Sequence, residues 1–226
     1  SLPHAPVRWL TVQEHFKDLV VGTYGRGFWI FDDLTPLQQW TPEVAKEDVH
    51  FFKPRPAYRF QQVAGPADAP NDSTTGKNPP YGASINYFLK EEPKEKEEVV
   101  VTILDAQGKT VRTLKTEEKK GGEEGDGEGG RGAEPFKVPK KAGINRVSWD
   151  LRYDKTAEVK LWTPVVDHEH ANVGPKGWRA FPPGRERSGP LVEPGQYTVK
   201  LKVGGREFSQ GLTVLKDPNT TGTTAD

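Results

Sequence analysis

Glycine and proline are so frequent along this chain that long helices have little room to form. The 226 residues include 24 glycines and 20 prolines, and both residue types disfavour the interior of a helix. The apolar residues between them are rich in Val, Trp, Tyr and Phe, which fit the pleated surface of a strand. Only 33% of the residues are hydrophobic, so we expect short strands joined by polar connections. The sequence therefore predicts an all-β fold.

Charge and residue usage argue against several classes of protein. Lys and Arg number 32, as do Asp and Glu, so the net charge is zero and nothing indicates binding to nucleic acid. The absence of cysteine excludes disulfides, zinc–thiolate sites and cysteine nucleophiles. No apolar run approaches the ~18 residues of a membrane-spanning helix, and no motif predicts a cofactor. The chain lacks methionine and begins at Ser1, from which we expect a segment of a longer protein.

Three β-rich runs open the chain, at residues 7–13, 19–24 and 28–33. A short link containing Gly25 and Gly27 joins the last two, which predicts a hairpin. The apolar residues alternate between two faces, with Val20, Phe28 and Ile30 on one face and Val21, Trp29 and Phe31 on the other. A sheet that is apolar on both faces needs another layer of protein packed against each face. We therefore expect this region to contact protein outside the chain, either preceding blades of the same polypeptide or another subunit.

Three antiparallel strands of this length form most of one β-propeller blade. We assign residues 1–60 to the last strands of such a blade and its exit segment. Thr35, followed by Pro36, predicts a helical turn with Thr35 at the N-cap. Residues 61–80 are rich in Pro, Asn, Asp, Thr and Gly and are interpreted as a linker.

A second β-rich region covers residues 81–216 and has the short alternating strands of an immunoglobulin-like β-sandwich. Ile144, Val147 and Trp149 are the candidates for its core on one predicted strand. Two insertions interrupt the pattern, at residues 115–137, which are glycine-rich and acidic, and at residues 155–190. Residues 217–226 form a polar tail.

Residues 19–33, L-V-V-G-T-Y-G-R-G-F-W-I-F-D-D, resemble the last blade of bacterial BNR-repeat propellers related to the sortilin (VPS10) domain. Residues 101–114 (V-T-I-L-D-A-Q-G-K-T-V-R-T-L), 142–150 and 192–201 resemble an immunoglobulin-like module of the FlgD-like or fibronectin type III kind. The resemblance implies an extracytoplasmic bacterial protein. Many such propellers are labelled glycosyl hydrolases because their repeats are similar to those of sialidases, but this segment contains no S-x-D-x-G-x-T-W Asp-box.

Few residues qualify as candidates for chemistry. His168 and His170 lie two apart and would share one side of a strand, as a weak metal site would require. A solvated loop is the preferred interpretation, because no third ligand is placed. Tyr24 and Arg26 are of the residue types found in sialidase sites, but they match no catalytic position, so they remain candidate partner contacts.

Three aromatic residues in the second insertion are candidates for ligand contact. Trp162, Trp178 and Phe181 could form a platform on which the apolar face of a sugar stacks. A small core that anchors the insertion is the preferred interpretation, because long loops need anchors.

The sequence therefore favours a non-catalytic accessory segment of a larger extracytoplasmic propeller protein, which mediates protein packing or surface attachment. One alternative is the C-terminal part of a sialidase-related enzyme whose active site lies in other blades. Another is a carbohydrate-binding module that takes a glycan. No catalytic residue is assigned, because no convergent set of catalytic groups is present.

Overall fold

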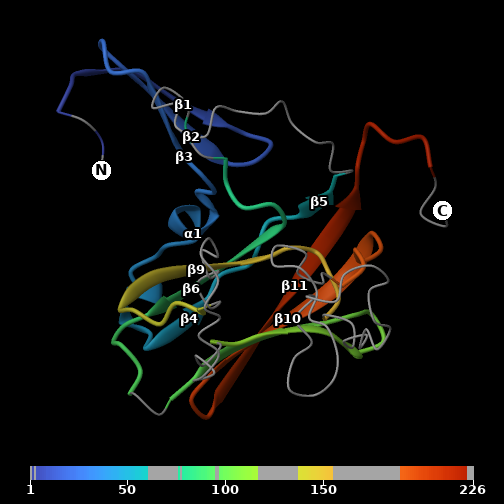
Figure 1. Cartoon of the computed structure of the whole chain (residues 1–226). Coiled ribbons are helices and arrows are strands. Elements are labelled where there is room, and N and C mark those ends of the chain that lie inside the picture. The colour runs from blue at the N-terminus through green and yellow to red at the C-terminus, as the bar shows by residue number, and fades with distance from the viewer. Residues whose placement is uncertain are drawn as a thin grey trace, which may run out of the picture.

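The computed structural model describes residues 2, 4–60, 76, 78–94, 97–116, 137–154 and 189–222. Within these residues the chain forms three β-sheets and only two short helical turns. The predicted all-β fold is confirmed. The strands divide into an N-terminal sheet and a two-sheet sandwich, which lie apart in Figure 1.

The N-terminal sheet is an antiparallel meander with the strand order β1-β2-β3. Its strands are β1 (Val7–Gln13), β2 (Asp18–Thr23) and β3 (Phe28–Phe31). The turn between β2 and β3 contains Gly25 at φ +73° and Gly27 at φ +72°. These left-handed conformations are open to glycine at no steric cost, which explains the two glycines of the predicted hairpin.

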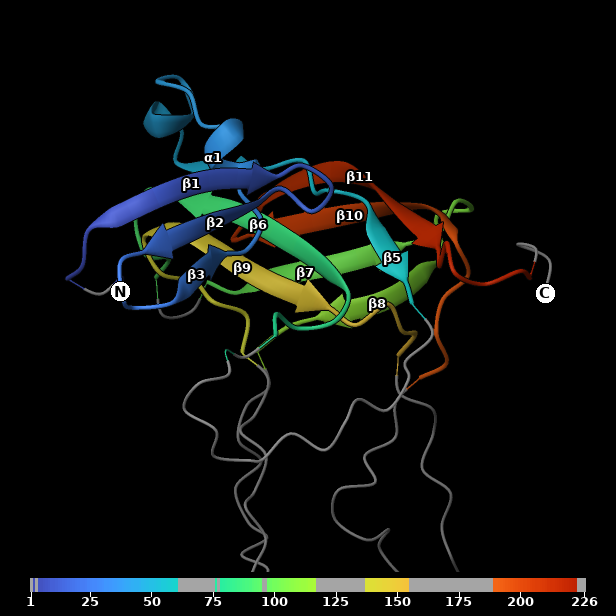
Figure 2. The same cartoon turned by 90° about the horizontal axis from the view of Figure 1, so that it is seen from above.

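Two sheets make the sandwich, and they are seen from above in Figure 2. The larger sheet has the order β5-β11-β10-β7-β8 and the smaller has the order β4-β6-β9. The strands of the larger sheet are β5 (Ala57–Arg59), β11 (Arg206–Lys216), β10 (Gly195–Val203), β7 (Val99–Leu104) and β8 (Thr110–Leu114). Those of the smaller sheet are β4 (Val49–Phe51), β6 (Ala83–Leu89) and β9 (Gly143–Trp149).

The connection from the N-terminal sheet to the sandwich carries both helical turns, α1 (Thr35–Gln38) and η1 (Val44–Lys46). The chain then forms β4 in the smaller sheet and β5 in the larger one, where β5 runs parallel to β11. Pro54 and Pro56 lie between β4 and β5, where no ladder needs their missing N–H groups.

The core of the sandwich lies between its two sheets. Burial alternates along β7, β9 and β10, as expected of strands with one face inward. Trp149 is fully buried, donates from Nε1 to the Arg152 carbonyl oxygen at 2.9 Å and packs edge-on against Tyr197. Val147 is also buried, whereas Ile144 is 43% exposed. The prediction of Ile144 as a core residue was wrong, because the two-residue period that buries Val147 and Trp149 puts Ile144 on the outer face.

A candidate assembly surface on the N-terminal sheet

Strand register decides which side chains of the N-terminal sheet share a face. Val21 lies opposite Leu10 and Trp29, while Gly22 lies opposite Trp9 and Phe28. We call the two faces the Trp29 face and the Phe28 face. The Trp29 face carries Leu10, Val12, Leu19, Val21, Trp29 and Phe31. The Phe28 face carries Trp9, Thr11, Val20, Gly22, Phe28 and Ile30.

Large apolar side chains are exposed on both faces. On the Phe28 face, Phe28 is 83% exposed, Trp9 is 70% exposed and Ile30 is 63% exposed. On the Trp29 face, Leu10 is 60% exposed and Phe31 is 51% exposed. An aromatic side chain offers ~150–250 Å² of surface, so Trp9 and Phe28 alone leave roughly 300 Å² of apolar surface in water. The other exposed apolar side chains of the sheet add to this area, and contiguous apolar patches larger than a few hundred Å² mark interaction sites.

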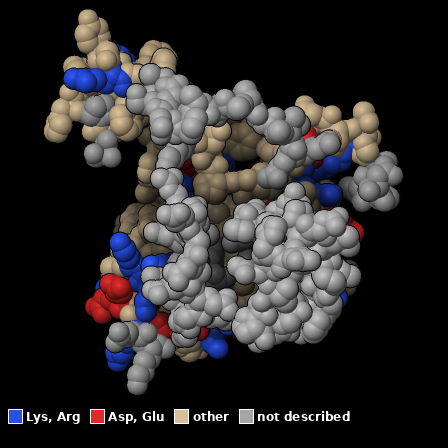
Figure 3. Space-filling model, viewed as in Figure 1, with Lys and Arg blue, Asp and Glu red and all other residues tan. Residues whose placement is uncertain are grey.

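The distribution of charge separates this surface from the rest of the molecule. Side chains other than Lys, Arg, Asp and Glu dominate the part of Figure 3 that corresponds to the N-terminal sheet, whereas acidic and basic side chains gather at the opposite end. Among large hydrophobic side chains exposed in the described residues, Ile144 is the one in the sandwich. The others lie in or near the N-terminal sheet and in the connection after it, up to Trp40.

The turn before β3 holds the two candidate residues that sequence analysis placed in this region. Tyr24 is 68% exposed, and the Arg8 guanidinium lies 5.2 Å from the centroid of its ring. The carbonyl oxygen of Arg26 accepts a hydrogen bond from Trp29 Nε1 at 3.1 Å. The backbone of Arg26 therefore fixes the orientation of the Trp29 indole, and both candidates stand beside the apolar faces.

A buried polar network joins the N-terminal sheet to the sandwich. Asp33 is 1% exposed and adopts φ +58°. Its backbone N–H donates to Asp18 Oδ1 at 2.8 Å, and its own Oδ1 accepts from the backbone N–H of Thr35 at 3.2 Å. Asn86 Nδ2 donates to Asp33 Oδ2 at 2.9 Å across the junction. Asn86 is also 1% exposed, whereas Arg146 is an exposed residue that completes the network by donating from Nε to Asn86 Oδ1 at 3.0 Å.

Arg146 also binds the backbone just after the last strand of the N-terminal sheet. Its Nη2 donates to the carbonyl oxygens of Asp32 at 2.8 Å and of Asp33 at 3.1 Å. Buried polar groups with every partner in place fix one arrangement of the elements that carry them. The network therefore sets the orientation of the N-terminal sheet relative to β6 and β9.

An aromatic contact in the connection that leads into β2, at the same end of the strand as Asp18, supports the same junction. His15 stacks on Tyr58 at 5.2 Å between ring centroids, and Phe16 meets Tyr58 edge-on at 6.0 Å. Arg55 lies over the Phe16 ring at 5.3 Å, and its Nη1 donates to the Phe16 carbonyl oxygen. The connection between β1 and β2 is thus held against β5 and the segment just before it.

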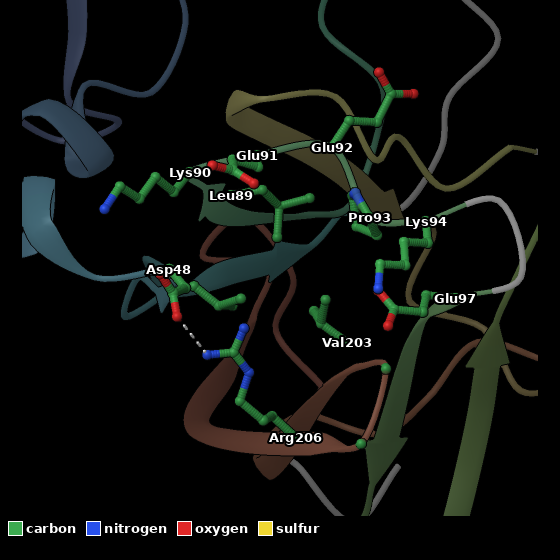
Figure 4. Close-up of a pocket in the computed structure, with 13 residues that line it drawn as sticks. Asp48, Leu89, Lys90, Glu91, Glu92, Pro93, Lys94, Glu97, Val203 and Arg206 are labelled. Carbon is green, nitrogen blue, oxygen red and sulfur yellow. Dashed lines mark hydrogen bonds and ion pairs between the residues drawn. The ribbon is translucent and has the colours of Figure 1, made fainter.

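Described residues line at least two hollows. One of about 350 Å³ lies at the junction and is lined by Phe31, Asp33, Pro36, Leu37, Asn86, Ile144 and Arg146. The other, of about 370 Å³, lies at the charged end of the sandwich, where Asp48 and Arg206 form an ion pair at 3.2 Å (Figure 4). Both members of that pair are more than half exposed, so the second hollow is an open charged surface rather than an enclosed site.

The remaining candidates from the sequence are not tested. Trp162, Trp178, Phe181, His168 and His170 lie outside the described residues. Within the described part of the chain, no group of three metal-ligating side chains comes together. No helix among those residues is long and apolar enough to cross a membrane.

Sequence reasoning missed the junction. Asp33, Asn86 and Arg146 are far apart in the chain, and no spacing rule links them. Of the three, only Asp33 has a residue type that could have indicated its conformation, because Asp and Asn are enriched among residues with positive φ.

Comparison with known proteins gives no further assignment. No protein-family model, no curated protein and no solved structure matches the chain.

Proposed function

We propose that this chain is a non-catalytic assembly segment of a larger extracytoplasmic β-propeller protein. The N-terminal sheet is part of the last blade, and neighbouring blades cover its two faces. The sandwich is an immunoglobulin-like module attached to that blade. The proposal rests on the resemblance of residues 19–33 to the last blade of sortilin-related BNR-repeat propellers and on one structural observation, the exposure of large apolar side chains on both faces of one sheet.

Two-sided exposure favours a blade over a surface that binds one partner. A single docking surface needs one apolar face, and the other face of the sheet can then be polar. A propeller blade lies between two neighbours and needs both faces apolar. Phe28 and Ile30 on one face and Leu10 and Phe31 on the other meet this second requirement.

The junction gives the sandwich a defined position relative to the N-terminal sheet. The hydrogen bonds from Asn86 and Arg146 to Asp33 hold β6 and β9 against the end of β3. Val21 at the centre of the Trp29 face is buried, but large side chains on both faces of the N-terminal sheet stay exposed in the described residues, so the sandwich does not occupy the position of a neighbouring blade. An accessory domain at the periphery of a propeller would have this arrangement.

The test compares the mass of the chain in solution with that of face-directed variants. Light scattering of the wild type at rising concentration is expected to show association through the exposed faces. A Trp9→Thr/Phe28→Thr double variant should associate less while the sandwich unfolds at the same temperature. Ile144→Thr is the matched control, because it removes a large aliphatic side chain of the sandwich that is 43% exposed.

Limited proteolysis gives the second measurement. Cleavage is expected within residues 4–31 before any strand of the sandwich is cut, because uncovered strands open more readily. A monomer whose N-terminal sheet resists protease as well as the sandwich does would contradict the proposal.

A further inference from the structure

The hollow of about 350 Å³ at the junction combines apolar side chains with a positive charge. Three of its lining residues are large apolar side chains that are between 43% and 53% exposed, Phe31, Leu37 and Ile144. We call these three side chains the apolar wall. They come from β3, α1 and β9, so the hollow forms where the N-terminal sheet, the connection and the sandwich meet. Its volume is at the lower end of the range of ligand pockets, about 300–1,000 Å³.

Arg146 supplies the positive charge. It lines the hollow and is an exposed residue. Its hydrogen bonds to Asn86 and to the backbone of Asp32 and Asp33 come from Nε and Nη2. A guanidinium has five N–H groups to donate, and no bond from Nη1 to another described residue is present. The side chain is therefore held in place by some of its donors and keeps others for a ligand.

The charge of Arg146 has no direct counter-ion in the part of the chain that the structure describes. None of the ion pairs found there includes Arg146. Asp33 is the acidic member of the junction network, but its carboxylate accepts hydrogen bonds from Thr35 and Asn86. Asn86 in turn links it to Arg146. Because a guanidinium donates a stronger hydrogen bond to a carboxylate than to a neutral acceptor, a carboxylate is the group that best fits beside Arg146.

The hollow continues the Trp29 face of the N-terminal sheet. Phe31 belongs to that face and also lines the hollow. Leu10 and Phe31 leave apolar surface exposed on the same face, and under the proposed function other protein covers it. A protein segment that packs on this face and extends past Phe31 enters the hollow. This continuity favours a protein segment over a free small molecule as the occupant.

We propose that the junction hollow binds an acidic side chain of the protein that covers the Trp29 face, with apolar side chains beside it. This inference rests on the proposed function and deepens it, because it names the chemistry of the partner at one position. The carboxylate accepts from Arg146 Nη1, and the neighbouring side chains pack against the apolar wall. Arg146 is already held by Asn86 and by the backbone, so little side-chain entropy is lost when the carboxylate binds.

Two matched peptides test the inference on the full chain. Acetyl-Leu-Glu-Leu-amide carries one carboxylate between two apolar side chains, and acetyl-Leu-Gln-Leu-amide has the same shape without the charge. Each is added to millimolar concentration, because so short a segment binds weakly. Binding is followed by the NMR shifts of Arg146 Nε–H and of the backbone amides of Leu37 and Ile144. The Glu peptide should bind roughly fivefold more tightly than the Gln peptide, as a partly exposed ion pair allows.

Three variants assign the binding to the hollow. Arg146→Gln should make the two peptides bind equally, because the charge is gone. Leu37→Ser should weaken both peptides, because it removes part of the apolar wall while the side chains of the junction network stay in place. Trp9→Thr is the matched control on the Phe28 face and should leave both affinities unchanged. Thermal unfolding reports whether each variant remains folded.

The salt dependence of binding to the wild type needs no substitution in the junction. Arg146→Gln also removes the hydrogen bonds to Asn86 and to the backbone, so a loss in that variant alone has two causes. Added NaCl should weaken the Glu peptide and leave the Gln peptide nearly unaffected, because salt screens a partly exposed charge pair.

Three results would overturn the inference. One is equal binding of the two peptides to the wild type, or no binding of either. The second is a set of Glu-peptide shifts at the charged end of the sandwich, near Arg206, instead of at Leu37 and Ile144. The third is binding of 3-phenylpropanoate at the hollow as tightly as the Glu peptide, which would assign the hollow to a small apolar carboxylate.

None of these results bears on the Phe28 face. Association that depends on Trp9 and Phe28 would still support the proposed function if the hollow bound neither peptide. Ile144→Thr remains a control for that association, because Ile144 lines the hollow beside the other face of the sheet.

Discussion

The sandwich and the N-terminal sheet are built from the same kinds of residue but differ in what covers them. In the sandwich, Trp149, Tyr87 and Ile85 are fully buried between two sheets of one chain. In the N-terminal sheet, side chains as large as Trp9 and Phe28 remain mostly exposed. The sandwich buries its own apolar faces, whereas the N-terminal sheet leaves large apolar side chains exposed to solvent.

The largest expected effect separates core from surface with one pair of variants. Trp149→Ala should lower the free energy of unfolding by about 3–5 kcal/mol, because it leaves a cavity and removes the hydrogen bond to Arg152. Phe28→Ala should change it by less than about 0.5 kcal/mol, because the ring is already in water. Urea denaturation followed by fluorescence measures both. Equal losses would mean that Phe28 is covered within the chain.

The junction should give the next largest effect. Asn86→Leu removes the donor to Asp33 Oδ2 and the acceptor of Arg146 Nε. Leaving the buried Asp33 carboxylate without this donor should cost about 2–3 kcal/mol, whereas the exposed Arg146 can bond to water instead. Calorimetry measures the loss, and protease cleavage should appear within residues 32–40. Gln196→Leu is the control, since it removes an exposed hydrogen bond to Thr213 and should cost little. An unchanged stability in Asn86→Leu would show that the network does not hold the two regions together.

Alkaline pH should weaken the sandwich through its buried tyrosines. Burial raises the pKa of Tyr87, and burial together with Tyr153 raises the pKa of Tyr197 to about 12. A tyrosine whose pKa is higher in the folded state favours folding below its unfolded pKa of about 10 and loses that contribution as the pH rises. Stability should therefore fall by up to about 1.4 kcal/mol per pH unit for Tyr197 between about pH 10 and its folded pKa.

Tyr197→Phe tests the assignment. The variant should lose less stability between neutral and alkaline pH than the wild type, after allowance for the lost hydrogen bond to the Glu193 carbonyl oxygen. Unfolding is followed by circular dichroism across the pH range. An identical pH profile in the two proteins would exclude Tyr197 as the cause.

The smallest effect is expected at the glycine-rich insertion. Thr116 Oγ1 accepts from Val138 N at 3.2 Å and so closes the base of this insertion. Replacement of residues 117–136 by a short turn should leave the melting temperature nearly unchanged, because the strands on either side keep their contacts. Thr116→Val is the companion variant and should cost about 1 kcal/mol by removing that acceptor. A large loss on deletion would show that the insertion contributes to the core.

Much of the fold follows from local patterns. Glycines in the turns predict the hairpins. In one such turn Gly108 adopts φ +79°, and Asp105 Oδ1 accepts hydrogen bonds from the backbone N–H groups of Gln107 and Lys109. Alternation predicts the burial of Val147 and Trp149. In each case the cause lies within a few residues of the effect, so the sequence contains the information.

Features that depend on distant partners were not predictable in the same way. The N-cap assigned to Thr35 was wrong: Thr35 is the first helical residue, and Asp33 from upstream accepts its N–H. The third strand was expected to reach residue 33 but ends at Phe31. Asp33 lies outside the third strand because Asn86, which is 53 residues later in the chain, binds its carboxylate. No sequence pattern around residue 33 reveals that contact.

The apolar surface of the N-terminal sheet does not depend on distant partners in this way. The alternation of apolar residues along its strands was enough to predict that both of its faces are apolar. Val21 and Trp29 share one side and Phe28 and Ile30 the other, as the alternation of the sequence requires. The position of the sandwich relative to these two faces could not be predicted from the sequence, because it depends on the junction. The structure adds that the sandwich covers neither face fully.

The most direct measurement is amide hydrogen exchange of the isolated chain, compared between β1–β3 and the sandwich strands β6, β7 and β10. If the N-terminal sheet depends on other protein for its cover, its amides should exchange by local opening at a much lower free energy than those of the sandwich. The account predicts that β1, β2 and β3 lose protection long before the sandwich strands do. Equal protection of both regions in a monomeric chain would contradict it.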